Sequence, residues 1–391
     1  MATESFNTLS VHAGEDLDDH FGALSVPIYS ASTFAFPDAD EGAAIHNELK
    51  AGYYYGRLGN PTTSALERAV AQLENAESAL AFSSGMSAVT AAVLSVCRAG
   101  DHLVAPASMY STASNLFRYL EDRLHIGTSF IDATTAENYR AATKENTKLY
   151  WLETPSNPLM QITNLRTVSS FAKEAGITTV ADNTFATPYN QKPLELGVDA
   201  VMHSATKYLG GHSDLTAGVL AGSNTIVETA RHEAGKLFGG NIAPQVAWLV
   251  MRGIKTLGLR MERHNQNASA LANMFKEHPK VMATYYPGLG SHPNHAIAKA
   301  QMRGFGGMIG LDVDTSEAAK ALLNNLKLCK IATSLGGVET IIQHSASMTH
   351  ATVSPESRTA AGISDGLLRL SVGIEDIDDL KRDFEQAFAR I

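Results

Sequence analysis

The stretch of sequence that decides the fold is DAVMHSATKYLGGHSD, residues 199–214. Its first six residues form a short, largely apolar run that predicts a buried strand. Ser204 is the last residue of this run, and Thr206 and Lys207 follow it. A lysine at such a position is unusual. Desolvation would lower the pKa of its amine and make that amine a nucleophile. The two hydroxyls beside it could bind a phosphate, so this stretch predicts a reactive lysine next to an anion site.

Strands and helices alternate along the chain on both sides of this stretch. Short apolar strands separated by helices are typical of a parallel sheet that is covered on both faces. We therefore predict an α/β fold. The predicted strands span residues 79–82, 102–106, 148–153, 177–182 and 217–222, and the predicted helices span residues 64–75 and 86–97.

A change of pattern near residue 250 divides the chain into three predicted parts. Residues 1–60 form an irregular N-terminal arm punctuated by prolines, residues 61–252 form the large domain, and residues 253–391 form a smaller α+β domain. The last part is predicted to contain a long helix over residues 251–278, broken near Gly253 or Gly258, then strands such as 306–313 and helices over residues 315–326 and 377–391.

Composition excludes several classes of function. The 31 Lys and Arg residues against 40 Asp and Glu residues give a net charge of -9, so there is no basic footprint for nucleic acid or a membrane surface. No apolar run reaches the ~18 residues that a membrane span needs, and the N-terminus lacks the apolar core of a signal peptide. Cys97 and Cys329 have no CxxC spacing, and the histidines have no metal-ligand spacing. We therefore expect a cytoplasmic protein without a metal site.

Candidate ligand-binding residues follow three other predicted strands. In an open parallel sheet, ligands bind beyond the carboxyl ends of the strands. Gly85 and Met86 open a helix whose backbone N–H groups could approach a phosphate, although a serine N-cap explains this start as well. Asp182, followed by Thr184, is a carboxylate that needs a partner at a buried strand end, for which a cap or an ion pair is the plainer explanation. Tyr110 could stack on a ring, although a lone aromatic is more often core.

A phosphate cradle, a carboxylate and a lysine at the ends of strands together indicate pyridoxal phosphate. In such a site the lysine bonds to the cofactor, the carboxylate pairs with the pyridinium nitrogen and the hydroxyls hold the phosphate. Two other classes stay open: a nucleotide-dependent oxidoreductase, supported only by the alternating strands and the glycines, and a catalytically silent protein on the same fold. Lys207 and Asp182 favour the pyridoxal phosphate enzyme.

Several motifs in order along the chain resemble the Cys/Met-metabolism enzymes, a family of fold-type-I pyridoxal phosphate enzymes. That family includes methionine γ-lyases, cystathionine γ-lyases and γ-synthases, and homoserine-ester sulfhydrylases. The resemblance implies a mostly parallel seven-stranded sheet with helices on both faces and a smaller C-terminal α+β domain. The motifs are SATKYLGGHSD (204–214), YYYGRLGNPTTSALE (53–67), ETPSNP (153–158), VADNTF (180–185) and SLGGVET (334–340).

The resemblance also implies roles for the matching residues. Lys207 would be the Schiff-base lysine and the proton shuttle, and Asp182 would pair with the pyridine nitrogen. Tyr110 would stack on the ring and act as acid or base near the leaving group. The residues implied to hold the rest of the cofactor, chiefly its phosphate, are Ser204, Thr206, Thr184 and the backbone of Gly85 and Met86.

Two further groups of residues are implied to act from other parts of the chain. Tyr55 and Arg57 match a Tyr-x-Arg motif that reaches the cofactor phosphate of the neighbouring subunit, and a guanidinium fork suits a phosphate. The resemblance therefore implies a homotetramer, a dimer of dimers with shared active sites. Asn157, Ser334 and Arg369 sit where the family contacts cofactor O3′ and the substrate carboxylate. From the residues alone, Arg369 would more simply be a solvated strand arginine.

The substrate is the least specified property. Family members that handle cystathionine usually carry Glu before the serine of the SLGG motif, where this chain has Thr333. The flanking IIQHSASMTH (341–350) and SPESR (354–358) are most similar to methionine γ-lyases, but those usually carry Gly-Cys where this chain has Ser111 and Thr112. We place Thr333 and Thr112 at the substrate.

We therefore expect a pyridoxal 5′-phosphate-dependent carbon–sulfur lyase that performs γ-elimination on a sulfur amino acid, as methionine γ-lyases do. The products would be 2-oxobutanoate, ammonia and a thiol. The alternatives are a cystathionine γ-lyase, a cystathionine γ-synthase or an O-acyl-homoserine sulfhydrylase, the last two of which perform γ-replacement. Sulfhydrylases often carry Asn in place of Ser334, and this stretch lacks that signature.

Overall fold

The larger of two sheets contains seven strands in the order β1-β7-β6-β5-β4-β2-β3. The five strands from β2 to β6 are parallel, and β7 runs antiparallel to both of its neighbours. The predicted, mostly parallel sheet is therefore confirmed. The strands are β1 (Ser78–Phe82), β2 (His102–Pro106), β3 (Gly127–Ile131), β4 (Thr147–Glu153), β5 (Thr178–Asp182), β6 (Ala200–His203) and β7 (Gly218–Gly222).

Strand β3 is the one strand of this sheet that the sequence did not predict. It reads GTSFI, and all five of its residues are half-buried at the edge of the sheet. An edge strand needs no continuous apolar run, because one side of it faces solvent. The apolar pattern that marked the inner strands is therefore missing here.

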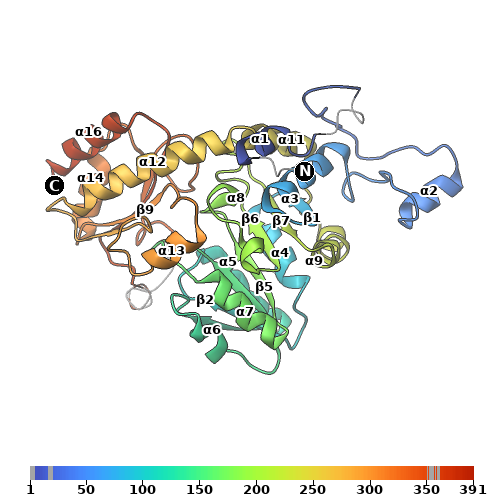
Figure 1. Ribbon diagram of the computed structural model, residues 1–391, viewed down its shortest axis with the longest axis horizontal. Coiled ribbons are helices and arrows are strands. Elements are labelled where there is room, and N and C mark those ends of the chain that lie inside the picture. Colours follow the sequence, from blue (N-terminus) through green and yellow to red (C-terminus); the bar gives the residue numbers. More distant parts are fainter. Residues whose placement is uncertain (1–4, 16–20, 350, 352–355, 357, 359–361) are drawn as a thin grey trace.

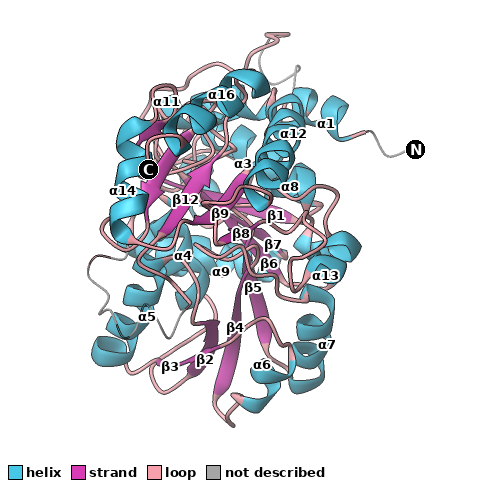
Figure 2. Ribbon diagram, turned by 90° about the vertical axis from the view of Figure 1, so that its left-hand side faces the viewer, coloured by secondary structure: helices cyan, strands magenta, loops and turns pink. Residues whose placement is uncertain are grey.

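Helices cover both faces of the large sheet, as Figure 2 shows. On one face, α3 (Pro61–Glu74) and α11 (Pro244–Ile254) pack on β1 and β7, and α6 (Glu137–Ala141) and α7 (Leu165–Ala175) pack on β4 and β5. The other face is covered by α4 (Gly85–Leu94), α5 (Ser111–Leu124) and α9 (Asn224–Thr229). Shorter elements are α8 (Thr187–Asn190), η2 (Pro193–Leu196), η3 (Ala230–Gly235) and α10 (Lys236–Phe238).

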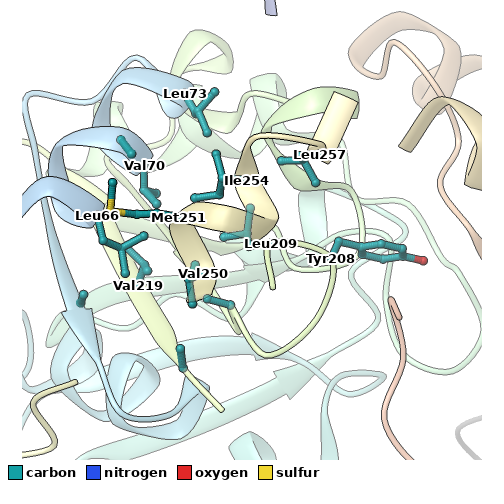
Figure 3. Close-up of a cluster of buried hydrophobic side chains, with 14 of the residues drawn as sticks. Leu66, Val70, Leu73, Tyr208, Leu209, Val219, Val250, Met251, Ile254 and Leu257 are labelled. Atoms are coloured by element: carbon teal, nitrogen blue, oxygen red, sulfur yellow. The ribbon is translucent and has the colours of Figure 1, made fainter. Parts of the chain in front are cut away.

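Helix α3 shows how local signals place an element. The side chain of Asn60 caps it by accepting a hydrogen bond from the backbone N–H of Thr62, and Pro61 occupies its first turn. Its apolar face is buried against α11. Figure 3 shows this contact, in which Leu66, Val70 and Leu73 of α3 lie beside Val250, Met251 and Ile254 of α11.

A smaller mixed sheet of five strands follows, in the order β10-β11-β12-β9-β8. Its strands are β8 (Ala283–Tyr285), β9 (Met308–Asp312), β10 (Lys330–Ile331), β11 (Ile341–His344) and β12 (Leu367–Ser371). The accompanying helices are α12 (Leu257–Lys276), α13 (His295–Gln301), α14 (Ser316–Asn325) and α16 (Ile377–Phe388). The two sheets come from residues 78–222 and 283–371, on either side of the predicted boundary at residues 252–253, which stays a prediction.

The predicted break in the long helix lies between α11 and α12, at residues 255–256. A side chain on Gly253 would meet the carbonyl oxygen of Gly210 at 2.3 Å, so the close approach of the two backbones requires glycine there. The buried Arg260 holds the same junction, because it donates hydrogen bonds to the carbonyls of Gly253 and Tyr208, both at 2.7 Å.

The N-terminal arm is not wholly irregular, because it contains α1 (Phe6–His12) and α2 (Ala39–His46). The segment that carries α2 extends away from the rest of the chain in Figure 1. The computed structural model describes residues 5–15, 21–349, 351, 356, 358 and 362–391. Most of the SPESR motif at 354–358 therefore lies outside the described residues. Within them, no helix is long and apolar enough to cross a bilayer.

Candidate active site

A cavity of about 360 Å³ lies beyond the carboxyl ends of β4, β5 and β6, where the smaller sheet meets the larger one. Its volume is in the range of small-molecule sites. The large sheet supplies residues after β1, β2, β4, β5 and β6, and the smaller sheet supplies residues after β10 and on β12. The predicted site residues that line it are Gly85, Met86, Tyr110, Asn157, Asp182, Thr184, Ser204, Thr206, Lys207, Thr333, Ser334 and Arg369.

One end of the cavity is the N-terminus of α4. Ser84 caps this helix by accepting a hydrogen bond from the backbone N–H of Ser87 at 3.1 Å. A Cβ on Gly85 would meet the Cβ and Oγ of Ser204 at 2.8 Å, so only glycine lets the helix start so close to that hydroxyl. Free N–H groups, the helix dipole and a hydroxyl therefore gather at one point, which is a favourable place for a phosphate.

The hydroxyl of Thr206 is tied to the same loop. Its Oγ1 donates to the carbonyl of Ala217 at 3.2 Å and accepts from the N–H of Ala217 at 3.0 Å. These two bonds join the turn that follows β6 to Ala217, and Lys207 is the residue after Thr206 in that turn. The turn therefore presents Lys207 to the cavity in a defined position.

Lys207 is the amine of the cavity. Its Nζ donates a hydrogen bond to the Oγ of Ser334 at 2.6 Å. Burial, and to a lesser degree the nearby Arg369, lowers the pKa of Lys207 to about 8. Ser334 itself has a left-handed φ of 77°, an unusual conformation for a residue with a side chain, and such strain concentrates at functional sites.

Arg369 lies on β12 and is 5% exposed, so the simpler interpretation of a solvated strand arginine is wrong. Its guanidinium donates to the Oδ1 of Asn157 at 3.0 Å and to the carbonyl of Ser334 at 2.7 Å. Both acceptors are neutral, and burial lowers the pKa of Arg369 to about 10. A buried cation held by neutral oxygens at a cavity wall can bind a carboxylate of a ligand.

Two carboxyl groups lie at the floor of the cavity, one at the end of β5 and one at the end of β4. The Oδ1 of Asp182 accepts a hydrogen bond from the N–H of Thr184 at 2.9 Å, and burial raises the pKa of Asp182. Burial raises the pKa of Glu153 well above its usual range, and the neighbouring Asp182 adds to that shift. A positively charged group of a ligand that binds here would therefore favour the ionised form of these two carboxyl groups and would pair with their negative charge.

Glu153 is the residue that the sequence analysis missed. It accepts backbone hydrogen bonds from Tyr110 at 2.9 Å and from Asn157 at 3.1 Å, so one buried carboxyl anchors two loops of the cavity. The rule that singled out Asp182 would have found it, because Glu153 also ends a predicted strand and begins the ETPSNP motif.

Three predicted residues lie elsewhere in this chain. Tyr55 and Arg57 belong to the extended arm, where the guanidinium of Arg57 donates to the carbonyl of Lys236 and lies over the ring of Tyr55 at 5.7 Å. Neither residue lines the cavity of its own chain. Thr112 is exposed in the first turn of α5 and does not line the cavity either, whereas the preceding Ser111 donates to the carbonyl of Thr349 in the cavity wall.

The family model described as Cys/Met metabolism PLP-dependent enzyme matches residues 7–389. The chain belongs to this family. Pyridoxal 5′-phosphate is therefore its cofactor, as the sequence analysis predicted. The fold is the one found in this family, because solved structures of family enzymes superpose on nearly the whole chain.

Relatives of known activity differ in what they act on. An L-methionine gamma-lyase of Fusobacterium nucleatum subsp. nucleatum is 45% identical over 394 residues, covering 100% of both chains. A cystathionine gamma-lyase of Bacillus subtilis is 46% identical and covers 98% of this chain and 99% of its own. The crystal structure of a cystathionine gamma synthase from Xanthomonas oryzae pv. oryzae has a TM-score of 0.94 and 40% identity, covering 99% of this chain and 98% of its own.

The residues of the cavity fit the cofactor of the family. Pyridoxal 5′-phosphate offers a phosphate, a basic ring nitrogen and an aldehyde, which call for anion donors, a carboxylate and an amine. The start of α4 with Ser204, the carboxyl of Asp182 and the amine of Lys207 provide one of each around a single cavity. Among the described residues, no group of His, Cys, Asp or Glu is arranged to hold a metal ion.

Proposed function

We propose that this family member is a carbon–sulfur lyase that performs γ-elimination on a sulfur amino acid with an uncharged side chain, such as methionine. The products are 2-oxobutanoate, ammonia and a thiol. The observation that carries the proposal is the charge of the cavity wall. Among the described lining residues the only carboxyl groups are Glu153 and Asp182, and Glu153 is engaged by two backbone N–H groups.

Thr333 supports the choice of an uncharged side chain. It lines the cavity next to Ser334. The resemblance implies a glutamate at this position in enzymes that handle cystathionine, whose distal ammonium needs a partner. A threonine cannot balance that charge, so a buried distal ammonium would be left unpaired at a cost of several kcal/mol. A thioether needs no such partner.

In this proposal the chain's own residues divide the work. The N-terminus of α4 with Ser204 and Thr206 binds the phosphate, and Asp182 holds the ring nitrogen. Arg369, fixed by Asn157 and Ser334, binds and orients the substrate carboxylate. When bound, the cofactor supplies an electron sink for the carbon that loses its proton.

Lys207 and Tyr110 move the protons. With a pKa near 8, a substantial fraction of Lys207 is a neutral amine at physiological pH, so it can remove the proton from the Cα of the substrate. Tyr110 acts as the acid at the departing sulfur, and its loop is fixed because Glu153 accepts the hydrogen bond of its backbone N–H. Elimination from Cγ needs both groups, since protons leave Cα and then Cβ of the substrate, both within the reach of a base such as Lys207, and one proton arrives at the departing sulfur.

A second candidate function is cystathionine γ-lyase, cystathionine γ-synthase or O-acyl-homoserine sulfhydrylase. It is favoured by the relatives, because a cystathionine gamma-lyase is as similar to this chain as a methionine gamma-lyase is. Replacement would differ from elimination in two respects: the group that leaves Cγ would be the acyloxy group of an acylated homoserine, and a thiol or sulfide would then bond to Cγ in its place.

We also propose that the active sites are shared within a homotetramer, a dimer of dimers. Tyr55 and Arg57 lie between α2 and α3, outside the cavity of their own chain, and Tyr55 is 42% exposed. The N-terminal arm that carries them can bring Arg57 to the phosphate of a partner's cofactor.

A substrate panel tests the proposed function. The holoenzyme is given methionine, homocysteine, cystathionine, cysteine and acylated homoserines, and the release of 2-oxo acid and of thiol is measured for each. We expect the highest kcat/KM for methionine or homocysteine, whose sulfur is on Cγ, with 2-oxobutanoate in equal yield to the thiol released from methionine or the sulfide released from homocysteine. A preference for cystathionine by tenfold or more would refute the proposal in favour of the second candidate.

A further inference from the structure

A buried pair of titratable side chains lies near the cavity, outside the residues that line it. Glu74, the last residue of α3, and His203, the last residue of β6, are 0% and 1% exposed. The Nε2 of His203 donates to the Oε1 of Glu74 at 2.6 Å. The same oxygen accepts from the Nδ2 of Asn183 at 3.2 Å. No described arginine or lysine forms an ion pair with Glu74, so His203 is its titratable partner in the described part of the chain.

The sheet register places this pair next to Asp182. Asp182 of β5 is paired with Met202 of β6, and both side chains line the cavity. The following residues, Asn183 and His203, therefore point to the opposite side, toward α3. A backbone hydrogen bond from Asn183 to Met202 at 3.0 Å locks the two strand ends together.

The pair is poorly explained as a stabilising element. The Oε2 of Glu74 and the Nδ1 of His203 are buried without a hydrogen-bond partner in the described part of the chain. A buried ion pair with unsatisfied atoms is commonly less stable than apolar residues of the same volume. This unfavourable pair lies immediately behind the strand end that carries Asp182. That location points to a role of the pair in the site.

The imidazole has an electrostatic effect on Asp182. His203 lowers the pKa of Asp182, and so opposes the rise that burial causes in the pKa of that group. The hydrogen bond to Glu74 fixes the imidazole ring of His203 from the far side. On its own side of the sheet His203 contacts Glu74 from α3, and the neutral Asn183 donates to the same carboxylate. Asp182 lies on the neighbouring strand with its side chain on the opposite side.

We propose that His203, held by Glu74, is a positioning residue that keeps Asp182 ionised and directed at the ring nitrogen of pyridoxal 5′-phosphate. This inference rests on the proposed role of Asp182. It predicts that replacing His203 weakens only the part of cofactor binding that depends on the ring nitrogen. Binding through the phosphate and the aldehyde should not change.

The test compares two cofactors. The full-length chain, freed of cofactor, is titrated by equilibrium dialysis with pyridoxal 5′-phosphate and with its 1-deaza analogue, in which a C–H replaces the ring nitrogen. Wild type, His203→Gln and Glu74→Gln are measured. The control is His102→Gln, because His102 is 1% exposed in β2 of the same sheet, is bonded to Thr147 and Ser129, and does not line the cavity.

We expect His203→Gln to bind pyridoxal 5′-phosphate about tenfold more weakly than wild type, since losing the effect of His203 would shift the carboxyl of Asp182 by about one pKa unit. Glu74→Gln, which removes the carboxylate that fixes the imidazole ring, should weaken binding in the same direction. The affinity of both variants for the 1-deaza analogue should change less than about twofold, since the ring nitrogen is absent. His102→Gln should alter neither affinity. If His203→Gln does not fold, Glu74→Gln carries the same comparison.

Two results would overturn the inference. An equal loss of affinity for both cofactors in both variants would show a merely structural role, and no loss for either would show no role. Asp182→Asn separates this failure from that of the proposed function. If Asp182→Asn leaves the preference for pyridoxal 5′-phosphate over its analogue unchanged, the role of Asp182 itself is wrong. If only Asp182→Asn abolishes that preference, the inference about His203 alone is lost.

Discussion

The depressed pKa of Lys207 makes a quantitative prediction about the attachment of the cofactor. Only the neutral amine attacks the aldehyde of pyridoxal 5′-phosphate. With a pKa of about 8 in place of 10.5, about a tenth of Lys207 is neutral at pH 7, against about one part in 3,000 for an unshifted amine. The structure therefore raises the reactive fraction about 300-fold.

The pH dependence of attachment follows from this value. The fraction of neutral amine rises tenfold per pH unit below about 8 and levels off above it. We expect the rate constant for attachment to the cofactor-free protein, followed by stopped-flow absorbance, to rise with a slope of one in log units and to level off near pH 8. A rate that keeps rising with the same slope to pH 10 would refute the reasoning.

A variant tests the physical cause. Burial is the larger cause of the shift and Arg369 the smaller. Arg369→Met removes the nearby charge but keeps the site buried, so the midpoint should move upward by only part of the distance to 10.5. The matched control is Arg252→Met on α11, because Arg252 is an exposed cation that does not line the cavity. A midpoint that moves equally in both variants would contradict the assignment to Arg369.

Three further results are expected. Lys207→Ala should abolish turnover while cofactor binding persists weakly, and arginine should not rescue it, because a guanidinium stays protonated; retention of a tenth of wild-type turnover would refute the assignment. Thr333→Glu should shift relative kcat/KM from methionine toward cystathionine, since a carboxylate bonded to the distal ammonium contributes about 1–3 kcal/mol; an unchanged ratio would place Thr333 outside the side-chain pocket. Mixing Arg57→Ala with Lys207→Ala chains should restore about a quarter of wild-type activity, because half of randomly paired dimers are mixed and each has one intact site; mixed dimers without activity would show that Arg57 serves its own chain.

Local patterns in the sequence were enough to find most of the large sheet and the residues at its strand ends. Apolar runs mark β2, β4, β5 and β6 because both faces of an inner strand are buried. Side chains that follow such runs collect at one edge, since parallel strands end on the same side. Lys207 and Asp182 could therefore be assigned to one site before any contact was known. The pattern failed at β3, whose residues are only half-buried.

The sequence could not show how a residue far along the chain would be buried. Arg369 looked like a surface arginine because its neighbours on the strand alternate as in many half-exposed strands. Its burial depends on the smaller sheet closing over the larger one, which brings it to Asn157, 212 positions earlier. A single sequence has no local signal for a contact over that distance. The contact arises when two distant segments pack together, and the residue pattern of neither segment shows this.

By itself, then, the sequence determined the alternating elements, the family and the chemical types at the strand ends, because these depend on short patterns and on their order. Only the tertiary structure decided which of those residues share a cavity, how far burial shifts the pKa of Lys207, and that Glu153 and the Glu74–His203 pair stand behind the site. Those properties come from desolvation and from contacts between distant segments. They exist only once the two sheets and the helices between them have packed.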